Sequence, residues 1–173
     1  MFITNNELYQ SAEKTVELLK KFGLTVSTAE SCTGGMVAEY ITSVAGVSSV
    51  FELGIASYSL KMKHKILRVR QATLSQYGAV SRQTAGEMAA KVRILADSDI
   101  GVSVTGVAGP TGSEGKNPGT VYIALADTES VYVKKLNIEP ESRNFIRETT
   151  VFEVFSMINK YIEREYLSNE VNE

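Results

Sequence analysis

The sequence predicts a three-layer α/β/α sandwich around a mixed, mostly parallel sheet of about five strands. Segments with apolar residues at helical spacing alternate with short strand-like runs, which is typical of a sheet covered on both faces. The last two strand-like runs are separated only by Asp127-Thr128-Glu129, which predicts an antiparallel hairpin. At 173 residues, 43% hydrophobic and 22% charged, the chain has the size and composition of one globular domain, and we expect residues 1–173 to form it.

The first half of the chain predicts two helices and two strands. Residues 6–22 carry apolar side chains at helical spacing and end at Gly23, a suitable helix stop. Residues 24–29 read as a strand, and residues 36–44 return to a helix after a glycine-containing turn. Residues 48–58 predict the second strand.

The second half begins with a basic segment that shows no clear element, containing Lys61, Lys63, Lys65, Arg68 and Arg70. The elements predicted after it are a helical turn at 73–78, a helix capped by Ser81 and ending near Asp97, strands at 100–105, 120–126 and 130–136, and a helix over 142–164. In the last helix we expect six side chains to be buried: Phe145, Thr149, Phe152, Phe155, Ile158 and Ile162. The tail after Leu167 is expected to fray.

Composition excludes several classes of function. The net charge of −2 gives no general attraction for nucleic acid or an anionic membrane, so we expect neither as a partner. The first ten residues lack a signal-peptide pattern, and no stretch approaches the roughly 18 apolar residues of a membrane span. A single cysteine fits a reducing compartment, so a cytoplasmic protein is expected. One Cys and one His make a zinc site improbable, and we expect no metal or cofactor.

In open α/β sheets the site lies outside the carboxyl ends of the parallel strands. Three unusual loops begin there, at residues 30–35, 58–65 and 106–119. We therefore expect these three segments to meet at one crevice.

The first loop offers a hydroxyl and a helix start. Thr33-Gly34-Gly35 leaves backbone N–H groups where a helix dipole favours an anion, and Ser31 stands at the entry. Alternatively, Ser31 or Thr33 only caps the helix. Cys32 is a weaker candidate nucleophile, because His64 is the only conventional base and small buried cysteines are common.

The second loop offers a base. A lysine that is desolvated or close to other cations loses its proton near neutral pH, and Lys61, Lys63 and Lys65 all qualify by type. The alternative is an ordinary solvated basic stretch. Tyr58 either orders such a lysine or simply ends the strand.

The third loop and the last helix offer anion binding. The loop from Gly106 to Gly119 matches neither the nucleoside-triphosphate nor the dinucleotide glycine motif, so by itself it is a weak signal. Arg143 and Arg147 stand at a helix start, where the dipole disfavours cations. They either clamp an acid or phosphate, or pair with Glu139, Glu141 or Glu148.

Several motifs together resemble the C-terminal domain family of the competence-damage protein CinA, over about residues 6–162. They are Thr28-Ala29-Glu30-Ser31-Cys32-Thr33-Gly34-Gly35, Tyr58-Ser59 with Lys63, Gly78-Ala79-Val80-Ser81, Thr105-Gly106-Val107-Ala108-Gly109-Pro110 and Gly119-Thr120-Val121-Tyr122-Ile123. The family pattern also includes the two arginines, here Arg143 and Arg147.

The resemblance implies hydrolysis of nicotinamide mononucleotide to nicotinate mononucleotide and ammonia, without metal or cofactor, in pyridine-nucleotide salvage. By resemblance, Ser31 matches the nucleophile and Lys63 the general base, while Tyr58 and Thr105 match positions near the reacting centre. Spacing and composition do not choose Lys63 over Lys61. The residues expected to bind the substrate or its phosphate are Glu30, Cys32, Thr33, Gly34, Gly35, Gly106, Ala108, Gly109, Gly112, Arg143 and Arg147.

The sequence departs from the family pattern at two places beside the site. Arg68 stands where the family usually has glycine, and Lys116-Asn117-Pro118-Gly119 shifts the usual proline. Some family members carry a second, N-terminal domain, for which we expect no room in 173 residues.

Two other functions stay open: a non-enzymatic binding module linked to competence or recombination, and a serine-lysine hydrolase of another small amide. Apolar helix faces make a homo-oligomer, a dimer or larger, the expected assembly.

Overall fold

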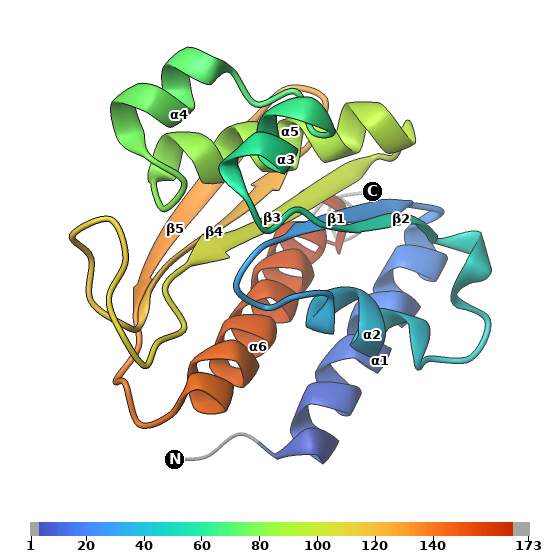
Figure 1. Cartoon of the computed structure of the whole chain (residues 1–173). Coiled ribbons are helices and arrows are strands. Elements are labelled where there is room, and N and C mark those ends of the chain that lie inside the picture. Colours follow the sequence, from blue (N-terminus) through green and yellow to red (C-terminus); the bar gives the residue numbers. More distant parts are fainter. Residues whose placement is uncertain (1–3, 168–173) are drawn as a thin grey trace.

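A computed structural model describes residues 4–167 of the chain. Helices cover both faces of a five-stranded sheet, which confirms the predicted mixed α/β fold (Figure 1). The strands are β1 (Val26–Glu30), β2 (Phe51–Ala56), β3 (Ile100–Gly106), β4 (Thr120–Ala126) and β5 (Val131–Asn137). The helices are α1 (Asn5–Phe22), α2 (Met36–Thr42), α3 (Leu60–Lys65), α4 (Gln71–Tyr77), α5 (Arg82–Ala96) and α6 (Arg143–Ile162), with short turns η1 (Val47–Ser49) and η2 (Glu163–Leu167).

The strand order β2-β1-β3-β4-β5 sets the position of the site. Strand β1 runs parallel to both β2 and β3, whereas β4 runs antiparallel to β3 and β5. The carboxyl ends of β1, β2 and β3 therefore meet at one edge of the sheet, at the left in Figure 1 for β1 and β3.

The two helical layers differ in how closely they approach the sheet. Helices α1, α2 and α6 lie on one face and α3, α4 and α5 on the other (Figure 1). A Cβ atom at Gly101 of β3 would collide with the carbonyl oxygen of Ala89 in α5. Glycine at this position thus lets α5 pack directly against the strand that leads into the site.

Two sequence predictions were wrong in detail. Residues 60–65 form α3, because Ser59 accepts a hydrogen bond from the N–H of Met62 and caps a helix that the lysine-rich sequence did not indicate. Phe152 is 36% exposed rather than buried, and Phe145 and Thr149 are only half-buried, because the core face of α6 runs through Ile146, Val151 and Phe155. The predicted fraying after Leu167 concerns residues outside the described range.

Candidate active site

A cleft of about 420 Å³ opens at the carboxyl edge of the sheet. The three loops expected to converge there do so, joined by the start of α6 and by residues 79–80 before α5. The lining residues are Ser31, Cys32, Tyr58, Leu60, Ala79, Val80, Thr105, Gly106, Val107, Ala108, Gly109, Thr111, Gly112, Ser113, Glu114 and Arg143. Its volume lies in the range of known small-molecule sites.

Ser31 and Lys63 are hydrogen-bonded at the floor of this cleft. Nζ of Lys63 donates to Ser31 Oγ at 2.9 Å and to the Ser57 carbonyl at 2.6 Å. Lys63 is fully buried, whereas Lys61 and Lys65 are exposed. Burial and the Ser31 contact therefore single out Lys63 among the three lysines.

Burial also changes the protonation of Lys63. Desolvation lowers the pKa of its amine from 10.5 to about 8, against weaker opposing effects of Cys32 and Glu114. A substantial fraction of the side chain is then neutral near physiological pH, which is the form that can accept a proton from a hydroxyl.

Burial shifts the pKa of Cys32 away from its reactive form, so Cys32 does not fit a nucleophile. Burial raises the pKa of its thiol to about 12, so the thiol stays protonated. His64, the base it would have needed, lies on the exposed side of α3 with Nδ1 2.8 Å from the Val69 carbonyl.

The anion site expected at the start of α2 is already filled by Glu30. Its buried carboxylate accepts hydrogen bonds from the N–H groups of Gly35, Val37 and Ala38 at 3.0 to 3.1 Å. The N–H of Gly34 donates to the Ser31 carbonyl. Assigning Glu30, Gly34 and Gly35 to phosphate binding is therefore corrected: the helix N-terminus is satisfied from within, and Glu30 holds the loop that carries Ser31.

Replacing Glu30 with glutamine is expected to destabilise the fold by about 2 kcal/mol, because an amide has one acceptor oxygen for three N–H donors and lacks the charge. Urea unfolding would measure it. Glu39→Gln, on the exposed face of the same helix, is the matched control, expected to change stability by less than about 0.5 kcal/mol. Equal stabilities of the two variants would contradict the role given to Glu30.

The two arginines donate hydrogen bonds to loop residues rather than pairing with nearby carboxylates, and Arg143 does so at the cleft itself. Arg143 donates to the Gly109 carbonyl at 2.7 Å and to Tyr58 Oη at 3.0 Å. Arg147 donates to the Thr33 carbonyl at 2.8 Å and lies outside the residues that line the cleft. Within residues 4–167 neither forms an ion pair with Glu139, Glu141 or Glu148.

Sequence reasoning missed one wall of the cleft. This wall is formed by Ala79 and Val80, and it is joined to the expected residue Thr105, whose hydroxyl donates to the Ala79 carbonyl at 2.7 Å. Ala79 and Val80 were noted as part of a motif without a role, and Glu114 and the Ser57 carbonyl were not singled out. The strand-to-loop position of Ser57 gave no side-chain signal, since its backbone oxygen makes the contact.

Several backbone donors at the cleft are unused. In the described part of the chain, the N–H groups of Ala108, Thr111 and Gly112, which all line the cleft, have no hydrogen-bond acceptor. These donors are available to a developing oxyanion or a bound anion.

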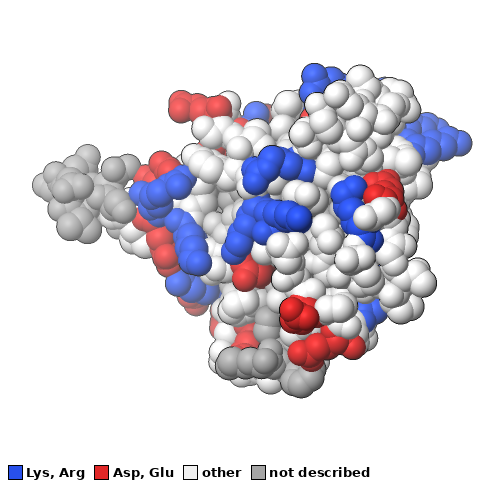
Figure 2. Space-filling view, turned by 90° about the vertical axis from the view of Figure 1, so that its left-hand side faces the viewer, with Lys and Arg blue, Asp and Glu red and all other residues white. Residues whose placement is uncertain are grey.

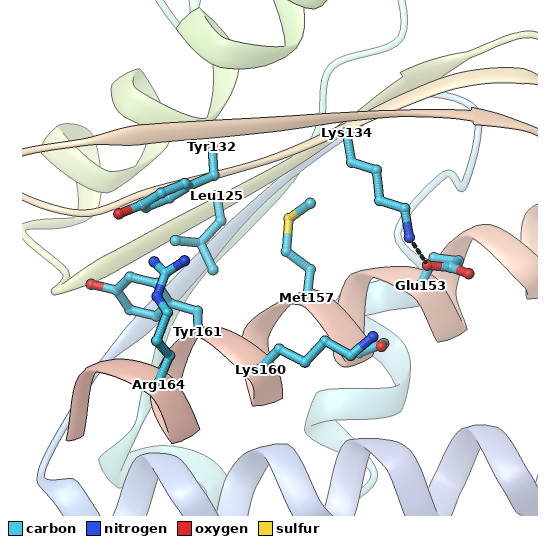
Figure 3. Close-up of a pocket in the computed structure, with 9 residues that line it drawn as sticks. Leu125, Tyr132, Lys134, Glu153, Met157, Lys160, Tyr161 and Arg164 are labelled. Carbon is cyan, nitrogen blue, oxygen red and sulfur yellow. Dashed lines mark hydrogen bonds and ion pairs between the residues drawn. The ribbon is translucent and has the colours of Figure 1, made fainter. Parts of the chain in front are cut away.

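A second hollow of about 280 Å³ lies between β4, β5 and α6 (Figure 3). Tyr132 and Lys134 of β5 face α6 across it, and Lys134 pairs with Glu153 at 2.7 Å. Within residues 4–167, no hydrogen bond there joins a serine hydroxyl to a base. The Ser31 cleft is therefore the better candidate for chemistry.

Comparison with known proteins agrees with the motifs around this cleft. The sequence model described as the CinA C-terminal domain matches residues 8–162. The chain belongs to the CinA C-terminal domain family. A protein of Caldanaerobacter subterraneus named as competence-damage inducible is 48% identical over 152 residues, 87% of this chain and 37% of that protein. A CinA-like protein of Kosmotoga olearia is 53% identical over 136 residues, 78% of this chain and 33% of that protein.

The chain thus spans about a third of the length of these curated CinA relatives. Solved structures match it over most of both chains. The competence/damage inducible protein CihA of Agrobacterium tumefaciens has a TM-score of 0.86 at 36% identity, covering 91% of this chain and 97% of that one. A CinA superfamily protein from Klebsiella pneumoniae has a TM-score of 0.88 at 26% identity, covering 91% and 98%. No helix between residues 4 and 167 has the length and hydropathy of a membrane span.

One departure from the CinA pattern has a structural consequence. Arg68, where the family usually has glycine, adopts φ 58°, the left-handed conformation that glycine occupies without steric cost. It is exposed on the chain after α3 and is not one of the residues that line the cleft.

Proposed function

We propose that this protein hydrolyses the carboxamide of nicotinamide mononucleotide to nicotinate mononucleotide and ammonia. The observation that carries the proposal is the buried Lys63 amine, hydrogen-bonded to Ser31 Oγ at the floor of a cleft. A hydroxyl beside a base of lowered pKa is the arrangement used by covalent amide hydrolases.

The proposed reaction has two stages. Neutral Lys63 takes the Ser31 proton as Oγ bonds to the amide carbon, and the proton then goes to the leaving nitrogen as the C–N bond breaks and ammonia departs. Water attacks the resulting ester, releasing the carboxylic acid and the free serine. The N–H group of Cys32, which follows Ser31 and lines the cleft, is the donor we propose for the oxyanion of both stages.

The nucleotide part of the substrate is supported by the surroundings of the cleft. The N–H groups of Ala108, Thr111 and Gly112 offer donors to a phosphate in the described chain. Lys and Arg side chains gather near the middle of the face onto which the carboxyl ends of β1 and β3 point (Figure 2). Arg143 lines the cleft, so a cation is available there to an anionic ligand although the whole chain carries a charge of −2.

The test is ammonia release from nicotinamide mononucleotide, the riboside without its phosphate, and nicotinamide. We expect kcat/KM to fall about 10²-fold from the nucleotide to the riboside, as for two lost charge-assisted hydrogen bonds. Release at equal rates from all three would point to a different small amide as substrate. Binding of the nucleotide without ammonia release would favour a binding module.

The rate should depend on pH through Lys63. Because only the neutral amine accepts the Ser31 proton, kcat/KM is expected to rise tenfold per pH unit at low pH and to level off above about 8, the pKa of Lys63. Initial rates between pH 6 and 10 would measure it, with thermal unfolding checked at each pH. A rate that falls as pH rises from 6 to 8 would contradict a neutral lysine base.

A further inference from the structure

Glu114 joins two walls of the cleft. It lies in the glycine-rich loop, and its carboxylate accepts hydrogen bonds from the N–H groups of Ala79 and Val80, each at 3.0 Å. All three residues line the cleft. The loop after β3 is thereby bound to the turn that leads into α5.

The turn that receives Glu114 is itself fixed. Thr105 of β3 donates to the Ala79 carbonyl at 2.7 Å, and Thr84 of α5 donates to the Gly78 carbonyl at 2.7 Å. Gly78 has φ +77°, and a Cβ there would come within 2.5 Å of a Glu114 carboxylate oxygen. The Gly78–Ser81 turn is therefore held in one conformation, and its glycine leaves room for the Glu114 carboxylate.

The glycine-rich loop is consequently held at two points. Arg143 donates a hydrogen bond to the Gly109 carbonyl, and the Gly78–Ser81 turn donates two to the Glu114 carboxylate. Between these points lie Thr111 and Gly112, whose N–H groups have no acceptor within residues 4–167. The position of these donors depends on both attachments.

Building on the proposed function, we propose that Glu114 is a positioning residue: it docks the glycine-rich loop on the Gly78–Ser81 turn and so holds the loop's free N–H groups where they bind the substrate's phosphate. Glu114 touches neither Ser31 nor Lys63 through a hydrogen bond in the described chain, so it acts on binding more than on chemistry.

Its charge gives a second, separable effect. The groups that act electrostatically on Lys63 are Cys32 after β1 and Glu114 in the glycine-rich loop, and both raise the pKa of the amine against desolvation. Removing the Glu114 charge should lower the pKa of Lys63 further. The acid limb of the rate profile then moves to lower pH, which loss of packing alone would not cause.

The kinetic test compares Glu114→Ala and Glu114→Gln with Glu129→Gln, an exposed carboxylate in the β4–β5 turn. If the docked loop is populated only a tenth of the time in Glu114→Ala, KM for nicotinamide mononucleotide rises about tenfold, with kcat within about twofold of wild type. Glu114→Gln keeps one acceptor, so it should show a smaller rise in KM together with the acid shift. Unchanged KM and pH profile in both variants would overturn the proposal.

Amide hydrogen exchange tests the same contact without a substrate. The N–H groups of Ala79 and Val80 should exchange at least about tenfold faster in Glu114→Ala than in wild type or Glu129→Gln. Equal exchange would show that Glu114 does not dock the loop. If wild type fails to hydrolyse the nucleotide, the proposed function fails, yet exchange still decides whether the docking exists.

Discussion

Ser31→Ala is expected to lower kcat for nicotinamide mononucleotide by at least about 10⁴-fold, because within residues 4–167 no other hydroxyl that lines the cleft is hydrogen-bonded to a base. Lys63 would keep its hydrogen bond to the Ser57 carbonyl, so the variant should fold normally. Steady-state ammonia release measures the effect.

Its control separates chemistry from folding and binding. Ser43→Ala removes an exposed hydroxyl at the end of α2 and should retain wild-type activity. Ser31→Ala should also bind the nucleotide by calorimetry with an affinity close to that of wild type. Activity of Ser31→Ala within tenfold of wild type would rule out the serine as nucleophile.

Lys63→Met should lower kcat by about 10³-fold while making the protein more stable. Methionine fills the same buried space but carries no proton acceptor. With a folded pKa of about 8 against 10.5 unfolded, the unfolded state binds more protons between these pH values. Stability of wild type therefore rises with pH across this window, by roughly 3 kcal/mol from this group.

The variant lacks this pH-dependent loss of stability, so its gain over wild type should be largest below pH 8 and shrink towards pH 10.5. Urea unfolding of both proteins at pH 7 and pH 9.5 would measure the difference. Lys61→Met, on the exposed side of α3, is the matched control and should affect neither activity nor stability strongly. Parallel stability profiles of wild type and Lys63→Met would contradict a buried, desolvated ammonium.

Identifying Lys63 as the base among the three lysines required knowing that residues 60–65 form a helix. On a helix, residues two apart point to opposite sides, so Lys63 faces inward when Lys61 and Lys65 face solvent. The lysine-rich sequence lacks the apolar stripe that would have indicated α3, and so the choice rested on family resemblance. In the helix that Ser59 caps, Lys63 is the buried lysine, and this burial distinguishes it from Lys61 and Lys65.

Other site assignments depended on long-range partners that a sequence does not display. Thr33-Gly34-Gly35 correctly indicated a helix start, but which anion satisfies it depended on Glu30 folding back onto α2. The unusual position of Arg143 was recognisable from sequence, whereas its bonds to Tyr58 and Gly109 cross 85 and 34 residues. Strand ranges were predicted well, because their alternation is local.

Ser31 is proposed to form a covalent intermediate, and intact-protein mass spectrometry of an acid-quenched reaction tests for it most directly. We expect a transient adduct with the mass of nicotinate mononucleotide less one water, located by fragmentation to Ser31. An adduct on any other residue, with ammonia still released by Ser31→Ala, would contradict it.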